Sequence, residues 1–91
     1  MGSGQNDEVN RYIHQGDTLF KEAQTLDEQE KFKEAKEKFK LAGQCYKLGT
    51  ELAQELGYNL QSYEAYKKYK LSESYFYAMD YRGIIKKNRE K

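Results

Sequence analysis

The sequence contains no proline, no tryptophan and a single cysteine, Cys45, among its 91 residues. Without a second cysteine an intrachain disulfide is excluded, and one free thiol fits a reducing compartment. No apolar run approaches the roughly 20 residues that a membrane-spanning helix needs, and no signal-peptide pattern is visible. We therefore expect a soluble, cytoplasmic protein without an integral membrane segment.

The motifs of common enzyme and cofactor sites are also missing. There is no glycine-rich phosphate loop and no H-E-x-x-H, and His14 is the only histidine. We interpret His14 as a structural or surface residue and Cys45 as a small buried hydrophobe. Three helices of the expected length leave little room for a substrate pocket. We predict no catalytic residues, no metal site, no cofactor and no small-molecule substrate, so the chain is not expected to be an enzyme.

What the chain does contain is typical of long solvated helices. Charged residues make up 34% of the sequence, and nine tyrosines and four phenylalanines provide apolar area for a core. Helical periodicity predicts an all-α antiparallel three-helix bundle, with helices at about 6–26, 29–56 and 60–88. Residues 6–88 form one domain in this prediction. Residues 1–5 are expected to be an expression-tag remnant and a disordered start.

The expected turns rest on local signals. Asp27 followed by Glu30 has the D-x-x-E form of a capping box, which would end the first helix and start the second. The competing interpretation is one unbroken helix over 6–56. Gly57 is predicted to end the second helix, and Asn59 or Ser62 to cap the third.

Each helix carries apolar stripes. Gaps of 3 and 4 along the second helix define one stripe, at Phe32, Ala35, Phe39, Ala42, Tyr46, Gly49, Ala53 and Leu56. A neighbouring stripe consists of Leu41, Cys45, Leu48 and Leu52. Two adjoining stripes predict that this helix is central and touches two neighbours. In the first helix, Gly16 marks either a tight helix crossing or a plain surface defect.

Two lines also run along the third helix. The line predicted to face the core consists of Leu71, Tyr75, Ala78, Arg82 and Ile85. The adjacent line, predicted to form the edge of a groove, consists of Lys67, Lys70, Ser74, Tyr77, Tyr81 and Ile84. Its side chains have apolar bodies and polar tips, which suit a partly wet surface.

Charge is distributed unevenly although the net charge is only +1. Residues 1–30 contain seven acids and two bases, and the remainder contains fourteen bases and eight acids. This asymmetry either favours packing of neighbouring helices or leaves a basic face for an acidic partner. The lysines on the polar face of the second helix are interpreted as ordinary solvated surface.

Parts of the sequence resemble known helical hairpins. Phe32–Ala42, with the pattern F-x2-A-x3-F-x2-A, resembles the second helix of a tetratricopeptide (TPR) repeat. Leu71–Tyr81, LSESYFYAMDY, resembles the first helix of such a repeat, with Ser72 at the small position and Tyr75 and Tyr81 at aromatic positions. The segment before Phe32 is about seven residues too long for a regular TPR array.

The longer hairpin resembles the microtubule-interacting and trafficking (MIT) domain, a three-helix bundle related in shape to a TPR unit. In AQTLDEQEKFKEA, the alanine, aspartate, aromatic and second alanine of that family's helix 1 to helix 2 segment correspond to Ala23, Asp27, Phe32 and Ala35. The resemblance implies an adaptor that binds an ESCRT-type tail and recruits a catalytic or trafficking neighbour. One departure lies in the third helix, where Tyr77 precedes Ala78 in place of the family's usual arginine.

From these observations the leading hypothesis is a module that docks a short helical peptide, acidic and leucine-containing, in a groove along the third helix. The predicted peptide-binding residues are Leu48, Leu52, Lys67, Lys70, Tyr77, Tyr81 and Ile84. The alternatives are a structural TPR-like or oligomerisation segment, in which the third helix breaks near Asp80, and weak nucleic-acid binding. A pI near 7.7 and the absence of a recognition motif place nucleic-acid binding last.

Overall fold

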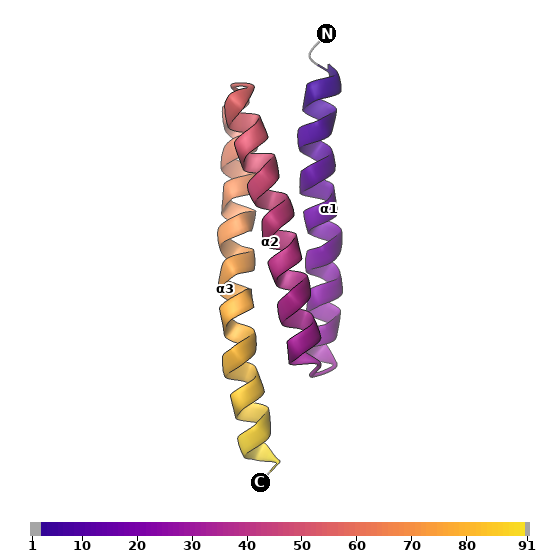
Figure 1. Cartoon of the computed structure of the whole chain (residues 1–91), viewed down its shortest axis with the longest axis vertical. Coiled ribbons are helices and arrows are strands. Elements are labelled where there is room, and N and C mark those ends of the chain that lie inside the picture. Colours follow the sequence, from indigo (N-terminus) through magenta and orange to yellow (C-terminus); the bar gives the residue numbers. More distant parts are fainter. Residues whose placement is uncertain (1–2, 91) are drawn as a thin grey trace.

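A computed structural model describes residues 3–90, which form three antiparallel helices (Figure 1). These are α1 (Ser3–Glu28), α2 (Phe32–Glu55) and α3 (Asn59–Arg89). The prediction of an all-α three-helix bundle is confirmed. Ser3–Gln5, expected to be disordered, belong to α1, whereas the expectation for residues 1 and 2 lies outside the described residues. α3 is one continuous helix, so the break near Asp80 that a repeat end requires is absent.

α2 lies between the other two helices, which confirms its predicted central position. The second predicted stripe does not face α3, because α3 packs on the side of Gly43, whereas Leu48 is 48% exposed. It packs along both α1 and α3, while α1 and α3 touch each other at only a few points (Figure 1). The result is an elongated body of 60 × 16 × 14 Å. Its radius of gyration of 15.2 Å exceeds the roughly 12 Å of a compact domain of this length. A bundle this elongated leaves long surface grooves beside its central helix.

The predicted core stripe of α2 is confirmed. Its buried members include Ala35, Phe39, Ala42, Tyr46, Gly49 and Ala53. The ring of Phe39 meets one aromatic from each neighbouring helix, with its centroid 5.2 Å from Phe20 and 5.1 Å from Tyr75. Such aromatic pairs add stabilisation beyond the area they bury. The three rings join all three helices near the middle of the molecule.

Gly16 marks a tight crossing of α1 over α2, which was one of its two interpretations. A β carbon at this position would lie 2.5 Å from Cε1 of Tyr46. Only glycine lets the two helices approach this closely without moving the tyrosine ring.

The first turn forms differently from the prediction. The unbroken helix is wrong, since α1 ends at Glu28 and Glu30 adopts a left-handed φ of 61°. The capping box is also wrong, because Lys31 is the N-cap residue of α2 and no side-chain cap bond is present there. Backbone bonds close the turn, and the carboxylates of Asp27 and Glu30 are used elsewhere.

For the second turn, the predicted helix stop is confirmed and the predicted cap of the third helix is wrong. Gly57 ends α2 with a φ of +78°, which confirms its role as the helix stop. Asn59 and Ser62 do not cap α3, since Tyr58 is its N-cap residue and no side chain makes a cap bond. Ser62 instead donates its hydroxyl to the carbonyl oxygen of Thr50, at 3.4 Å.

The core-facing line predicted for α3 is wrong in part. Leu71 and Ile85 are about half exposed, while the buried residues of α3 are Ser62, Ala65, Ser72 and Met79. The reason is the close approach of α2, where Gly43 faces Ser72 and a β carbon on the glycine would lie 3.6 Å from the serine's. Small residues fit this contact, so apolar character alone did not identify it. Tyr75 and Ala78 of the predicted line do pack against the core, as expected.

Candidate functional site

Four ion pairs connect the acidic N-terminal third of the chain to α2 and α3. They join Asp17 to Lys68, Glu22 to Lys38, Asp27 to Arg82 and Glu30 to Arg89, with N to O distances of 2.9, 3.0, 2.6 and 2.5 Å. The hydrogen bond from Arg89 also lowers the pKa of Glu30. The charge asymmetry of the sequence therefore serves helix packing, which was the first of its two interpretations.

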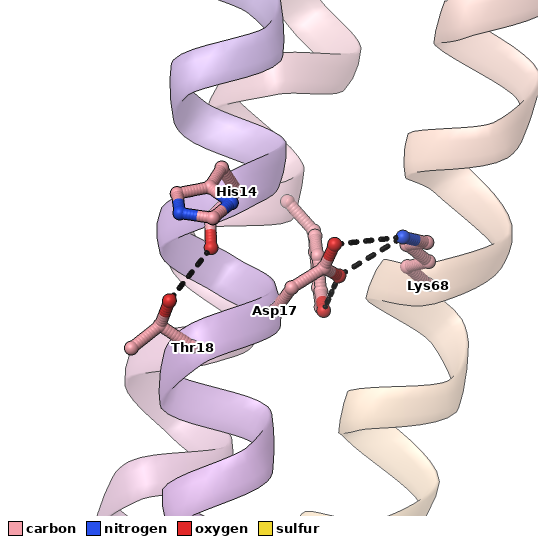
Figure 2. Close-up of polar contacts among 5 residues, drawn as sticks. His14, Asp17, Thr18 and Lys68 are labelled. Carbon is pink, nitrogen blue, oxygen red and sulfur yellow. Dashed lines mark hydrogen bonds and ion pairs between the residues drawn. The ribbon is translucent and has the colours of Figure 1, made fainter.

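The pair at Asp17 joins all three helices. Figure 2 shows the Lys68 ammonium of α3 bonded to both carboxylate oxygens of Asp17, at 2.9 and 3.1 Å. The hydroxyl of Tyr46, on α2, donates to the same carboxylate at 2.6 Å. Burial of Tyr46, together with this bond, raises the pKa of its phenol above the ordinary range. We assign this cluster to structure, because its groups satisfy one another.

His14 and Cys45 belong to no chemical cluster. His14 is exposed, and its backbone carbonyl accepts a hydrogen bond from Thr18 (Figure 2). Cys45 is half-buried, and burial raises the pKa of its thiol. Within residues 3–90 no three carboxylate, imidazole or thiol groups gather where they could hold a metal ion. None of the three described helices carries an apolar stretch of the length needed to cross a bilayer.

The main concave feature is a groove between α2 and α3, which we call the α2/α3 groove. Three hollows of about 390, 280 and 240 Å³ follow one another along it. The central hollow is lined by Phe39, Lys40, Gly43, Gln44 and Lys47 from α2 and by Tyr69, Glu73, Phe76 and Tyr77 from α3. The side of this hollow toward the core is formed by the buried residues Phe39 and Gly43.

One wall of the α2/α3 groove is basic. Lys33, Lys36, Lys40 and Lys47 line its hollows, at spacings of 3, 4 and 7 residues that place them in one row on α2. Lys36 pairs with Asp80 at 2.8 Å and lies 4.9 Å from the centroid of Phe76. Within residues 7–90 the other three have no ion-pair partner. They leave uncompensated positive charge along the groove.

The opposite wall, on α3, is mainly aromatic. Its ring-bearing members include Tyr63, Tyr66, Tyr69, Phe76 and Tyr77. The two acids of this wall are both paired, Asp80 with Lys36 and Glu73 with Lys70. The hydrogen bond from Lys70, at 2.9 Å, lowers the pKa of Glu73 and raises that of Lys70. The wall thus offers apolar surface with little free negative charge.

The predicted site residues are only partly brought together. Tyr77 and Ile84 line the α2/α3 groove, and Tyr81 is 67% exposed on the outer side of α3. Lys70 is exposed on α3 beside its partner Glu73. Lys67 borders a separate hollow with Glu64, Lys68 and Leu71.

Two further predicted site residues, Leu48 and Leu52, do not line the α2/α3 groove. Leu52 follows Gly43 by nine residues, or two and a half helical turns, and so lies on the opposite side of α2 from the groove. Leu48 is 48% exposed on the outward surface of α2 and is not among the groove-lining residues.

The lysine row of α2 is what the sequence interpretation missed. Lysines on the polar face of an amphipathic helix are common, so the sequence alone indicates solvated surface at Lys33, Lys36 and Lys40 and does not single out Lys47. The available signal was the spacing of Lys33, Lys36, Lys40 and Lys47, which places them in one row on the helix. Comparisons of the chain with models of protein families, with curated proteins and with solved structures gave no match.

Proposed function

We propose that the chain is a protein-interaction module that docks a short, acidic, leucine-containing helical segment of a partner protein in the α2/α3 groove. The observation that carries the proposal is the pairing of an apolar floor with three uncompensated lysines on one wall. Leucines of the partner would enter the hollows above Phe39 and Met79, while its acids would face Lys33, Lys40 and Lys47. Helix-in-groove recognition of this kind is a recurring mode of peptide binding.

The size of the hollows supports a peptide over a small molecule. The central hollow of about 280 Å³ falls at the lower end of small-molecule pockets, and it continues into hollows on both sides. A groove of this kind suits successive side chains along one helix. The proposal keeps the MIT-like assignment, with the difference that acid recognition is assigned to α2 and not to α3. The expected affinity is micromolar, about −8 kcal/mol.

The test is an NMR titration with a peptide of about 15 residues that places leucines on one helical face and glutamates on the next. Saturable shifts of the amide resonances of Gly43, Phe76 and Tyr77 are expected. The control peptide carries glutamine at every glutamate position and should bind more weakly, with a smaller dependence on salt. Amide resonances of α3 that stay in place throughout the titration would refute the proposal.

A pair of double variants tests the basic wall. Lys40→Glu with Lys47→Glu should weaken binding by about tenfold or more, since both charges face the proposed acids. Arg11→Glu with Lys21→Glu makes the same change of net charge on exposed positions of α1. Equal losses in the two variants would show that the attraction is non-specific.

A further inference from the structure

α3 carries two lines of residues with strictly alternating gaps of 3 and 4, and only one of them is covered. The inward line, Ala65, Tyr69, Ser72, Phe76 and Met79, is buried or half-buried, chiefly against α2. The outward line, Lys67, Lys70, Ser74, Tyr77, Tyr81 and Ile84, is exposed at every position. Alternating gaps of 3 and 4 are the spacing by which one helix packs along another. The outward line therefore has the pattern of a helix interface but no helix on it.

The composition of this surface differs from that of a solvated helix face. Of the nine large hydrophobic residues exposed on the described chain, eight lie on α3. Tyr77, Tyr81 and Ile84 of the outward line are 64%, 67% and 57% exposed. The line contains no acidic residue, and its two lysines are confined to its N-terminal half. Contiguous exposed apolar surface of this kind marks an interaction site.

The distribution of charge along the line selects the occupant. In a parallel pair of α3 helices, Lys67 would face its own copy, and the two like charges would repel each other. Lys70 would also face its own copy, although its charge is paired with Glu73. In an antiparallel pair the lysine half of one copy lies along the aromatic and aliphatic half of the other. Successive layers then set Ser74 against Tyr77, Lys70 against Tyr81, and Lys67 against Ile84, so that no lysine faces a lysine.

Within the chain, both lysines of the line already lie near tyrosine rings of α3. Lys67 lies 4.8 Å from the ring centroid of Tyr63, and Lys70 lies 5.9 Å from that of Tyr69. An ammonium over an aromatic face is attracted to it, and its aliphatic stem packs on the ring. The small Ser74 beside the ring of Tyr77 completes a large-against-small layer at the centre.

We propose that two copies of the chain associate through the outward line of α3, packed antiparallel about a two-fold axis between positions 75 and 76. The interface is self-complementary, as a two-fold interface must be. It shares Tyr77 and Ile84 with the wall of the α2/α3 groove, whereas the lysine row of α2 stays free.

Sedimentation from low micromolar to near-millimolar concentration tests the association. The wild-type chain should change from monomer to dimer, and Tyr81→Lys should raise the dissociation constant by about tenfold or more, because it sets a lysine against Lys70. Leu48→Lys makes the same kind of change at the exposed large hydrophobic residue outside α3 and should leave the dimer intact. A wild-type chain that remains monomeric, or equal effects of the two variants, would overturn the proposal.

Disulfide trapping tests the direction. In a Cys45→Ser background, a mixture of Lys70→Cys and Tyr81→Cys chains should form the mixed disulfide in preference to either symmetric one, since a disulfide needs β carbons about 4 Å apart. Preferential 70-to-70 and 81-to-81 disulfides would indicate a parallel pair and overturn the proposal. Circular dichroism of each variant verifies that the three helices remain folded.

Discussion

Gly16 lies against the aromatic ring of Tyr46, so that a β carbon at position 16 would be 2.5 Å from Cε1 and 2.9 Å from Cζ. The ring is held in place by the bond from its hydroxyl to Asp17. α1 and α2 therefore owe their close crossing to the absence of one side chain. Whether a glycine-to-alanine substitution raises or lowers the free energy of unfolding depends on whether such a contact is present.

Gly16→Ala is expected to lower the free energy of unfolding by about 1 to 3 kcal/mol, because the added methyl group overlaps a ring that cannot turn away. Gly83→Ala is the matched control, since a β carbon at position 83 meets nothing within 4 Å. There, alanine should stabilise the helix by about 0.5 to 1 kcal/mol. Urea unfolding of both variants checks the prediction, which fails if the two substitutions change stability in the same direction.

Ser72→Ala is expected to stabilise the protein. The hydroxyl of Ser72 is fully buried and has no hydrogen-bond partner among the described residues. Removing an unsatisfied buried hydroxyl should gain about 1 kcal/mol, which corresponds to a rise in Tm of about 4 to 8 °C. The matched change Ser62→Ala removes a hydroxyl that is bonded to Thr50 and should not raise Tm as far. Equal shifts of Tm in the two variants would show that Ser72 carries no such penalty.

Phe39→Ala should cost about 3 to 5 kcal/mol of unfolding free energy, enough to threaten a small domain. Phe39 is fully buried and contacts Phe20 and Tyr75, so its loss opens a cavity among three helices. Leu71→Ala, at a half-exposed position of α3, should cost less than about 1 kcal/mol. Denaturant unfolding measures both changes, and a loss below about 1 kcal/mol for Phe39→Ala would contradict the described core.

Tyr46 should make the wild-type protein sensitive to alkaline pH. In the unfolded chain a tyrosine titrates near pH 10, whereas burial and the bond to Asp17 raise the pKa of Tyr46 in the folded chain. Above about pH 10 the unfolded state therefore releases a proton that the folded state keeps. Stability from this source is complete below pH 10 and is lost as the pH rises, by up to about 1.4 kcal/mol per unit.

Comparison with Tyr46→Phe isolates this contribution. The variant lacks the phenol, so its unfolding free energy should fall less steeply above about pH 10 than that of the wild type. Thermal unfolding at a series of pH values from neutral to alkaline measures the two slopes. Parallel slopes would mean that Tyr46 ionises equally easily in both states.

The sequence alone was sufficient to predict the elements whose packing depends on the spacing of residues close together in the chain. The stripe from Ala35 to Ala53, the stop at Gly57 and the central position of α2 all follow from periods of 3 and 4 and from the conformational freedom of glycine. These features depend on neighbours within a few residues along the chain. Local patterns therefore predicted them correctly.

Features that depend on distant residues were not predictable in the same way. Asp27 and Glu30 resemble a capping box, but their carboxylates bind Arg82 and Arg89, 55 and 59 residues away. The core side of α3 was assigned only in part, because Ser72 packs against Gly43 at a contact where size matters more than hydropathy. The basic wall of the groove likewise becomes visible only when α3 is placed beside α2.

The arrangement of α1 and α3 along the central helix α2 also governs how folding can be observed. With an odd number of antiparallel helices, the chain starts at one end of the 60 Å body and finishes at the other (Figure 1). An unfolded protein chain of this length has a radius of gyration of about 30 Å, which corresponds to an end-to-end distance of about 70 Å. Fluorescence energy transfer between dyes at the two ends would thus change only modestly on unfolding. Dyes at Asn10 and Gln61, whose side chains are hydrogen-bonded in the folded state, would separate to about 50 Å and report unfolding clearly.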